Sequence, residues 1–136
     1  YCRFGDPETQ AIMMLLDDDI LQIMLESARG KFSRKEMKFY NGYSAVVVLA
    51  AEGYPGEYTK GINLNTLNNF KDNDTFIFHA GTEKKSEGIF SNGGRIMGVT
   101  SRATNLKDSL SNCYRLLNNY PITHTFFRKD IGGKAV

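Results

Sequence analysis

The sequence predicts an α+β fold in which a helical opening precedes a small, mostly antiparallel β domain that carries one helix. Residues 1–40 contain two apolar patterns with helical spacing. From residue 44 onward, short apolar and β-branched runs alternate with glycine and asparagine turns, which is typical of strands. One amphipathic stripe lies among them. With 136 residues, 41% of them hydrophobic, the chain suits one domain, or a small domain joined to a piece of another.

The opening predicts two short helices followed by a polar linker. Residues 7–16 form the first, because Asp6 is a favourable N-cap and a proline fits the first helical position, where its missing N–H would have no partner. Residues 20–29 form the second, since their apolar residues recur at spacings of three and four, and the aspartates at 17–19 supply its cap. The charged segment 31–41 is the predicted linker.

The rest of the chain predicts strands. Residues 44–51 are an unbroken apolar run, expected to be a strand buried on both faces. Residues 75–79 form a second strand. Residues 89–91 and 95–101 are expected to form a hairpin around Asn92-Gly-Gly94, because Asn-Gly favours the turn that hairpins need.

A third helix and a last strand complete the β domain. Asn105 is the expected cap of this helix, whose apolar residues recur at i, i+4, i+7, i+8 and i+11, and Pro121 ends it. Residues 123–127 are the last predicted strand, before a basic tail.

Charge and cysteine content exclude several functions. Seventeen basic against fifteen acidic residues give a net charge of only +2, too balanced for a surface dedicated to nucleic acid or membrane. The chain has no run of 18 apolar residues. Cys2 and Cys113 are too few for a disulfide framework and lack metal-ligand spacing, so we expect free thiols in a reducing cytoplasm. Because the chain does not begin with Met, it is interpreted as a fragment.

The first ten residues carry the strongest chemical signal. Arg3, expected to be buried, stands three residues before Asp6 and Pro7, where the free N–H groups of a first helical turn favour anions. This arrangement predicts an oxyanion or phosphate pocket. The alternative from the same residues is a capped helix with a structural arginine.

Five ordered segments resemble one enzyme family. They are Arg3-Phe-Gly-Asp-Pro-Glu-Thr-Gln10, Val47-Val-Leu-Ala-Ala-Glu-Gly-Tyr-Pro-Gly-Glu-Tyr-Thr-Lys-Gly61, Phe78-His-Ala-Gly-Thr82, Asn92-Gly-Gly-Arg-Ile-Met-Gly-Val-Thr100 and Arg128-Lys-Asp-Ile-Gly132. Together they resemble the C-terminal third of the glycinamide ribonucleotide synthetases (phosphoribosylamine–glycine ligases), ATP-grasp enzymes of purine synthesis. The resemblance implies that residues 1–40 end the ATP-grasp domain and that residues 41–136 form the small C-terminal domain.

The resemblance also implies a reaction and its substrates. ATP phosphorylates glycine, and the amine of phosphoribosylamine attacks the glycyl phosphate to give glycinamide ribonucleotide, ADP and phosphate. Such chemistry needs cationic donors over the transferring phosphoryl group and the tetrahedral intermediate. Arg3 is the candidate catalytic residue, since guanidinium offers a bidentate fork. The candidate substrate-binding residues are Asp6, which would hold the glycine ammonium, and Pro7, Gly93, Gly94, Arg95, Arg128 and Lys129.

Several of these residues also have structural interpretations. The Gly53–Gly61 loop is either a structural turn or an edge of the substrate site, and it lacks the Gly-Lys-Ser/Thr ending of a Walker loop. Gly93, Gly94 and Arg95 form either an ordinary turn or a phosphate grip, which relatives among ATP-grasp enzymes place in this region. The charged run at 128–130 is either a solvated tail or part of the site.

The metal site is where the sequence departs from the family. Members usually place a metal-binding Asn before the arginine, and here Tyr1 stands at that position, either as a replacement or as a non-native junction residue. The resemblance therefore implies ATP and Mg²⁺ (or Mn²⁺) for the intact parent, with neither bound by this fragment alone. Two alternatives remain open: a fragment of another ATP-grasp ligase or carboxylase, and a non-catalytic β-rich binding module.

Overall fold

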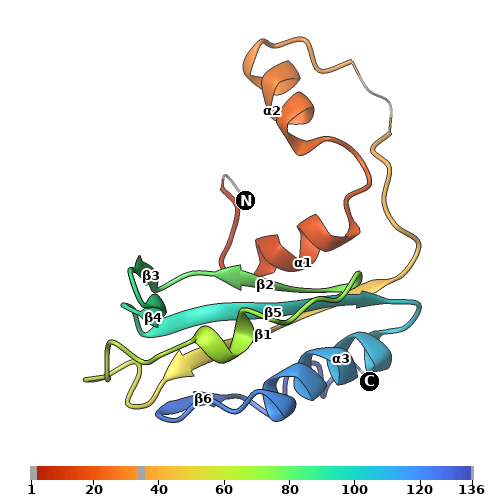
Figure 1. Cartoon of the computed structure of the whole chain (residues 1–136). Helices are drawn as coiled ribbons and strands as arrows, with labels where there is room; N and C mark the ends of the chain where they lie inside the picture. The colour runs from red at the N-terminus through yellow and green to blue at the C-terminus, as the bar shows by residue number, and fades with distance from the viewer. Residues whose placement is uncertain (1–2, 34–35, 136) are drawn as a thin grey trace.

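A computed structural model describes residues 3–33 and 36–135 (Figure 1). The elements in chain order are α1 (Glu8–Leu15), α2 (Ile20–Ala28), β1 (Tyr43–Ala51), a 3-10 turn η1 (Asn65–Leu67), β2 (Thr75–His79), β3 (Thr82–Lys85), β4 (Gly88–Ser91), β5 (Arg95–Ala103), α3 (Leu106–Asn119) and β6 (Thr125–Phe127). The α+β class and the mostly antiparallel sheet are confirmed.

Two sheets make up the β part. The larger has the order β2-β5-β1-β6 with every neighbouring pair antiparallel, and β3 pairs with β4 in a separate two-stranded sheet. The long strands β1 and β5 form the centre, with Val47 opposite Val99. β2 and β6 are the two edges of the larger sheet.

Helices lie on opposite faces of the larger sheet (Figure 1). α3 packs on one face, where Cys113, Leu116 and Leu117 join the main apolar core with residues of β1 and β5. α1 lies on the other face and buries Met14. β1 therefore alternates: its core-facing residues are buried, whereas Val46 is only half-buried. The expected burial on both faces is incomplete because α1, with eight residues, is too short to cover that face.

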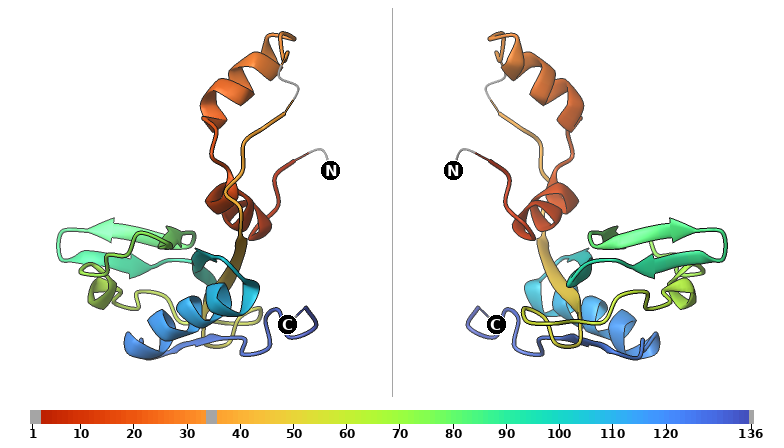
Figure 2. Two further views of the ribbon diagram at one scale, coloured as in Figure 1. Left: turned by 90° about the vertical axis from the view of Figure 1, so that its right-hand side faces the viewer. Right: turned by 90° about the vertical axis from the view of Figure 1, so that its left-hand side faces the viewer.

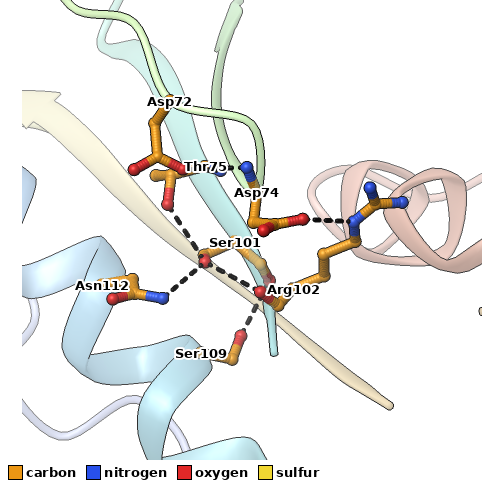
Figure 3. A network of polar contacts seen from close by, with 7 residues as sticks. All are labelled: Asp72, Asp74, Thr75, Ser101, Arg102, Ser109 and Asn112. Carbon is orange, nitrogen blue, oxygen red and sulfur yellow. Dashed lines mark hydrogen bonds and ion pairs between the residues drawn. The ribbon is translucent and has the colours of Figure 1, made fainter. Parts of the chain in front are cut away.

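A buried polar network joins α3 to the sheet (Figure 3). The Ser109 hydroxyl donates to the Ser101 carbonyl at 2.7 Å, and the Ser101 hydroxyl accepts from the Thr75 hydroxyl at 3.1 Å and from the Asn112 amide at 3.3 Å. Ser101 and Ser109 are fully buried, so these partners replace water. The network fixes the orientation of α3 against β2 and β5.

The local helix signals are mostly confirmed. The Asp19 carboxylate caps α2 by accepting from the N–H groups of Leu21 and Gln22, and the Asn105 side chain caps α3 by accepting from the Asp108 N–H at 2.9 Å. These caps need only residues within three positions of the helix start, which is why the sequence predicts them well.

The predicted hairpin around Asn92-Gly-Gly94 is wrong. β4 pairs with β3 through a turn at Ser86 and Glu87, and β5 pairs with β1 and β2. The glycine turn instead carries the chain from the small sheet to the large one. Its N–H groups at Asn92 and Gly93 both donate to the Gly81 carbonyl, at 2.8 and 3.1 Å.

α2 projects from the body of the molecule as an arm (Figure 2). A narrow neck anchors it, where the Asp17 N–H donates to the Lys38 carbonyl at 2.9 Å and the Tyr40 N–H donates to the Leu15 carbonyl at 2.7 Å. No described residue of α2 is buried, and Leu21 is 72% exposed. The apolar stripe that predicts this helix therefore has no cover within the described residues.

Cys113 provides a pH-dependent test of the core. Burial raises the pKa of its thiol from 9.0 to about 12. The unfolded chain ionises this thiol near pH 9 while the folded chain keeps it neutral, so the stabilisation is complete below pH 9 and is lost as the pH rises toward 12. We expect the free energy of unfolding to fall across this window by at most about 1.4 kcal/mol per pH unit from this group.

The measurement is a series of denaturant melts between pH 8 and 11 in a Cys2→Ser chain. Cys113→Ala in the same background is the control, because it keeps every other titrating group. Equal slopes for the two chains would show that the Cys113 thiol is not buried in solution.

Candidate functional site

Two predicted binding residues, 89 positions apart, meet at the start of β5. The Arg95 guanidinium donates from Nη2 to Asp6 Oδ2 at 2.7 Å and from Nη1 to the Asp6 carbonyl at 3.1 Å. Their side chains are 39% and 51% exposed, so the pair lies at the surface. The remaining N–H groups of this guanidinium have no partner among the described residues, which leaves Arg95 able to donate to a ligand.

The start of α1 differs from the prediction. Pro7, rather than Asp6, is the N-cap, and α1 begins at Glu8 without a side-chain cap. The Asp6 carboxylate is used by Arg95 instead, a long-range competitor that local sequence rules do not include. The Thr9 N–H donates to the Gly5 carbonyl and the Gln10 N–H to the Pro7 carbonyl, both at 3.3 Å, so this helix start has fewer free donors for an anion than expected.

Arg3 is exposed, contrary to the expectation of a buried side chain. It makes no ion pair or hydrogen bond with another residue of the described ranges 3–33 and 36–135. The alternative of a structural ion pair therefore has no support within this part of the chain. An unpaired arginine three residues before Asp6 keeps its full set of donors for a ligand.

Gly93 and Gly94 lie where two backbones and a ring approach closely. A Cβ on Gly93 would lie 2.9 Å from the Gly81 Cα, and a Cβ on Gly94 would lie 2.1 Å from Cδ2 of Tyr54. Real Cβ atoms do not make such contacts, so both positions require glycine for space. This packing explains the glycines without a ligand, and it also holds the backbone that leads into Arg95.

Arg128 and Lys129 lie elsewhere, directly after β6. The Arg128 guanidinium donates to both carboxylate oxygens of Asp130, at 2.9 and 2.6 Å, and this hydrogen-bonded contact lowers the pKa of the Asp130 carboxyl. Both side chains are exposed. Lys129 lines a cleft of about 260 Å³ with Tyr114 and Phe127. Because β1 separates β6 from β5, Arg128 is two strands away from Arg95 within the sheet.

The described residues were also compared with the requirements of a metal site and of a membrane-spanning helix. Among residues 3–33 and 36–135, no three His, Cys, Asp or Glu side chains are grouped closely enough to hold a metal ion. Tyr1, which the sequence resemblance predicts at the family's metal-binding position, lies outside the described residues, as does Cys2. In the described part of the chain, no helix has the length and apolar character to cross a membrane.

Sequence reasoning missed Tyr54 and the Asp6–Arg95 contact. Tyr54 belongs to the glycine-punctuated loop after β1, and its ring covers Gly94. Tyr58 meets it edge to face, with ring centroids 6.2 Å apart. The sequence therefore shows the loop that carries Tyr54, but it does not show that the Tyr54 ring packs on Gly94 at the start of β5.

The fold matches that of a solved ligase. The crystal structure of a phosphoribosylamine–glycine ligase from Thermotoga maritima superimposes with a TM-score of 0.77 and 29% identity, over 94% of this chain and 31% of that one. The chain is thus an α+β domain of the kind found in this class of ligase.

Sequence comparison defines the family. The family model described as "Phosphoribosylglycinamide synthetase, C domain" matches residues 44–134, and the chain belongs to this family. A phosphoribosylamine–glycine ligase of Leptospira interrogans is 43% identical over 99% of this chain and 32% of its own length. A bifunctional purine biosynthetic protein of Dictyostelium discoideum is 40% identical over 99% of this chain and 17% of its own length. The chain thus spans about a third or less of these relatives.

Proposed function

We propose that this chain is the C-terminal part of an ATP-dependent ligase that joins glycine to 5-phosphoribosylamine. The products are glycinamide ribonucleotide, ADP and phosphate, as in purine synthesis. The observation that carries the proposal is the 43% identity to a phosphoribosylamine–glycine ligase along 99% of the chain. A cytoplasmic location is part of the proposal, in keeping with the free Cys113 thiol.

The proposed domain boundary lies near residue 40. Residues 1–40 would end the ATP-grasp domain, and residues 41–136 would form the small C-terminal domain. The family match beginning at residue 44 supports this boundary. So does the uncovered apolar face of α2, because an amphipathic helix is stable in a larger body that buries its stripe. α1, in contrast, packs against the β domain and would lie at the junction.

The substrates would meet the chain at the corner formed by residues 3–7 and 93–95. Arg3 would donate to the transferring phosphoryl group and the tetrahedral intermediate, because both carry negative charge that a guanidinium stabilises. Asp6 would hold the glycine ammonium, and Arg95, with Gly93 and Gly94 before it, would hold the phosphate of phosphoribosylamine. Pro7 would place the α1 start beside these groups, and Arg128 and Lys129 would form a separate basic surface two strands away.

ATP and its Mg²⁺ or Mn²⁺ would be held by the parent outside this chain. The described acidic residues do not form a metal cluster. ATP would supply the phosphoryl group that activates the glycine carboxylate. The residues of this chain would bind and orient the two other substrates and stabilise the negative charge that develops.

The test compares the isolated chain with the intact parent. We expect ADP release from the parent only when glycine and phosphoribosylamine are both present, and no turnover by the isolated chain, because it has neither an adenine pocket motif nor a metal cluster among its described residues. A parent that is inactive with this pair, or that prefers another acceptor, would disprove the proposed function. Turnover by the isolated chain would disprove the proposal that ATP and the metal ion are bound by the parent outside this chain.

A further inference from the structure

We propose that Tyr54 is a positioning residue for Arg95, acting together with a β-bulge at Ile96. The inference rests on the proposed function, since it assigns to this corner the task of holding the phosphate of phosphoribosylamine. Tyr54 does not touch the substrate in this proposal. It fixes the backbone from which the Arg95 side chain emerges.

The bulge decides the face on which Arg95 lies. Met97 and Ser101 lie on the α3 face, where Met97 joins the core and the Ser101 hydroxyl accepts from the Asn112 amide of α3. Strict alternation along β5 would put Arg95 on that face too. However, Leu49 pairs with Met97 while its neighbour Ala50 pairs with Arg95, so Ile96 is an extra residue in β5. This extra residue moves Arg95 to the opposite face, toward Asp6, as β-bulges do when they redirect a side chain.

Backbone hydrogen bonds to the neighbouring segments on both sides of β5 stabilise the bulge. The N–H groups of Ala80 and Gly81 donate to the consecutive carbonyls of Ile96 and Arg95, at 3.0 and 2.9 Å. On the other side, the Ala51 N–H donates to the Gly94 carbonyl at 2.8 Å. The backbone from Gly94 to Ile96 is therefore bonded on both sides, and a shift at Gly94 would be transmitted to Arg95.

Tyr54 closes this arrangement from the loop after β1. Its N–H donates to the Ala51 carbonyl at 3.1 Å, which places its ring over Gly94. The space above Gly94 is filled so completely that a Cβ there would lie 2.1 Å from Cδ2 of the ring. The ring thus limits the movement of the Gly94 backbone at the start of β5. With this backbone in place, the Arg95 side chain reaches Asp6.

The experiment is a mutant cycle in the intact ligase, with the wild type first assayed for turnover of glycine and phosphoribosylamine. Tyr54→Ala should raise KM for phosphoribosylamine about three- to tenfold, a fraction of the loss expected for a complete charged contact. KM for glycine and ATP should stay within about twofold. Tyr54→Phe keeps the ring and should behave as the wild type. Gly94→Ala should show a larger rise than Tyr54→Ala, and the Gly94→Ala/Tyr54→Ala double variant should recover toward Tyr54→Ala alone.

Two results separate positioning from a general loss of stability. In an Arg95→Ala background, Tyr54→Ala should have no further effect on KM for phosphoribosylamine, although Tyr54→Ala should still lower the melting temperature. In a crystal structure of the Tyr54→Ala ligase, Arg95 should have left Asp6. Additive effects on KM, or an Arg95–Asp6 contact unchanged in that crystal, would overturn the proposal. An inactive wild type would instead refute the proposed function, and the crystal would still decide the position of Arg95.

Discussion

Arg3→Ala in the intact ligase is expected to lower kcat by about 10²–10³-fold, the usual cost of removing one preorganised donor to a transition state. The change in KM for ATP should be smaller, because the lost interaction strengthens as charge develops on the transferring phosphoryl group. The structural basis is an exposed arginine without a partner in the described chain, three residues before Asp6, which pairs with Arg95. Steady-state kinetics with all three substrates measure the effect.

Two controls make this result specific. Arg115→Ala removes another exposed arginine, on α3 and outside the corner, and should leave kcat unchanged. Arg3→Lys keeps the charge but loses the bidentate fork, so it should recover only part of the rate. Because Arg3 has no contact to lose within the described chain, its replacement should shift stability by no more than about 0.5 kcal/mol. A normal kcat in Arg3→Ala would remove Arg3 from the chemistry.

The predicted and unpredicted parts of the fold differ in the range of the interactions involved. α2, α3 and their caps depend on residues three or four positions apart, and Asp19 and Asn105 cap as the sequence indicates. Most strands were also predicted, because β-branched runs favour a pleated, half-buried surface, but the polar strand β3 (Thr82–Lys85) was missed. The choice of partner strand was not predicted either, and β4 pairs with β3 instead of β5.

The glycine turn shows why partner choice was missed. Asn-Gly is a hairpin signal, but Gly93 packs against the Gly81 backbone, and the Gly94 carbonyl bonds to Ala51 in β1. These contacts join segments more than ten residues apart, so no local pattern contains them. The same limit applies to Asp6, whose local preference for a helix cap is overridden by an ion pair with Arg95.

The candidate site follows the same division. The residue types were identified in the sequence, as an arginine in the first motif and another after the glycine turn. The contact of Arg95 with Asp6 of the first motif, and the position of Arg128 two strands away, are properties of the topology. Arg102 is a further example. Its guanidinium donates to Asp74 and lies 4.8 Å from the centre of the Tyr40 ring, and the residues near Arg102 in the sequence predict neither contact.

Arg95→Ala in the intact ligase is expected to raise KM for phosphoribosylamine on the order of tenfold to a hundredfold. A charge-assisted hydrogen bond is worth about 1.5–3 kcal/mol, which converts to that range. The substrate phosphate takes no part in bond making, so its binding is nearly the same in the ground and transition states, and its loss appears in KM rather than in kcat. Constants for glycine and ATP should hardly change.

The geometry also predicts a small effect of Arg95→Ala on stability. An exposed pair such as Asp6–Arg95 contributes about 0–1 kcal/mol, so the melting temperature should stay close to that of the wild type. Arg102→Ala is the matched control, because Arg102 lies on the same strand in a similar ion pair, with Nε 2.9 Å from Asp74 Oδ1. It should lower the melting temperature more than Arg95→Ala does, because Arg102 also lies over the Tyr40 ring, 4.8 Å from its centre, and it should leave the substrate constants unchanged. Titration with glycinamide ribonucleotide, alongside melting curves, distinguishes the roles: if Arg95→Ala behaves like Arg102→Ala, Arg95 braces the corner and does not bind the phosphate.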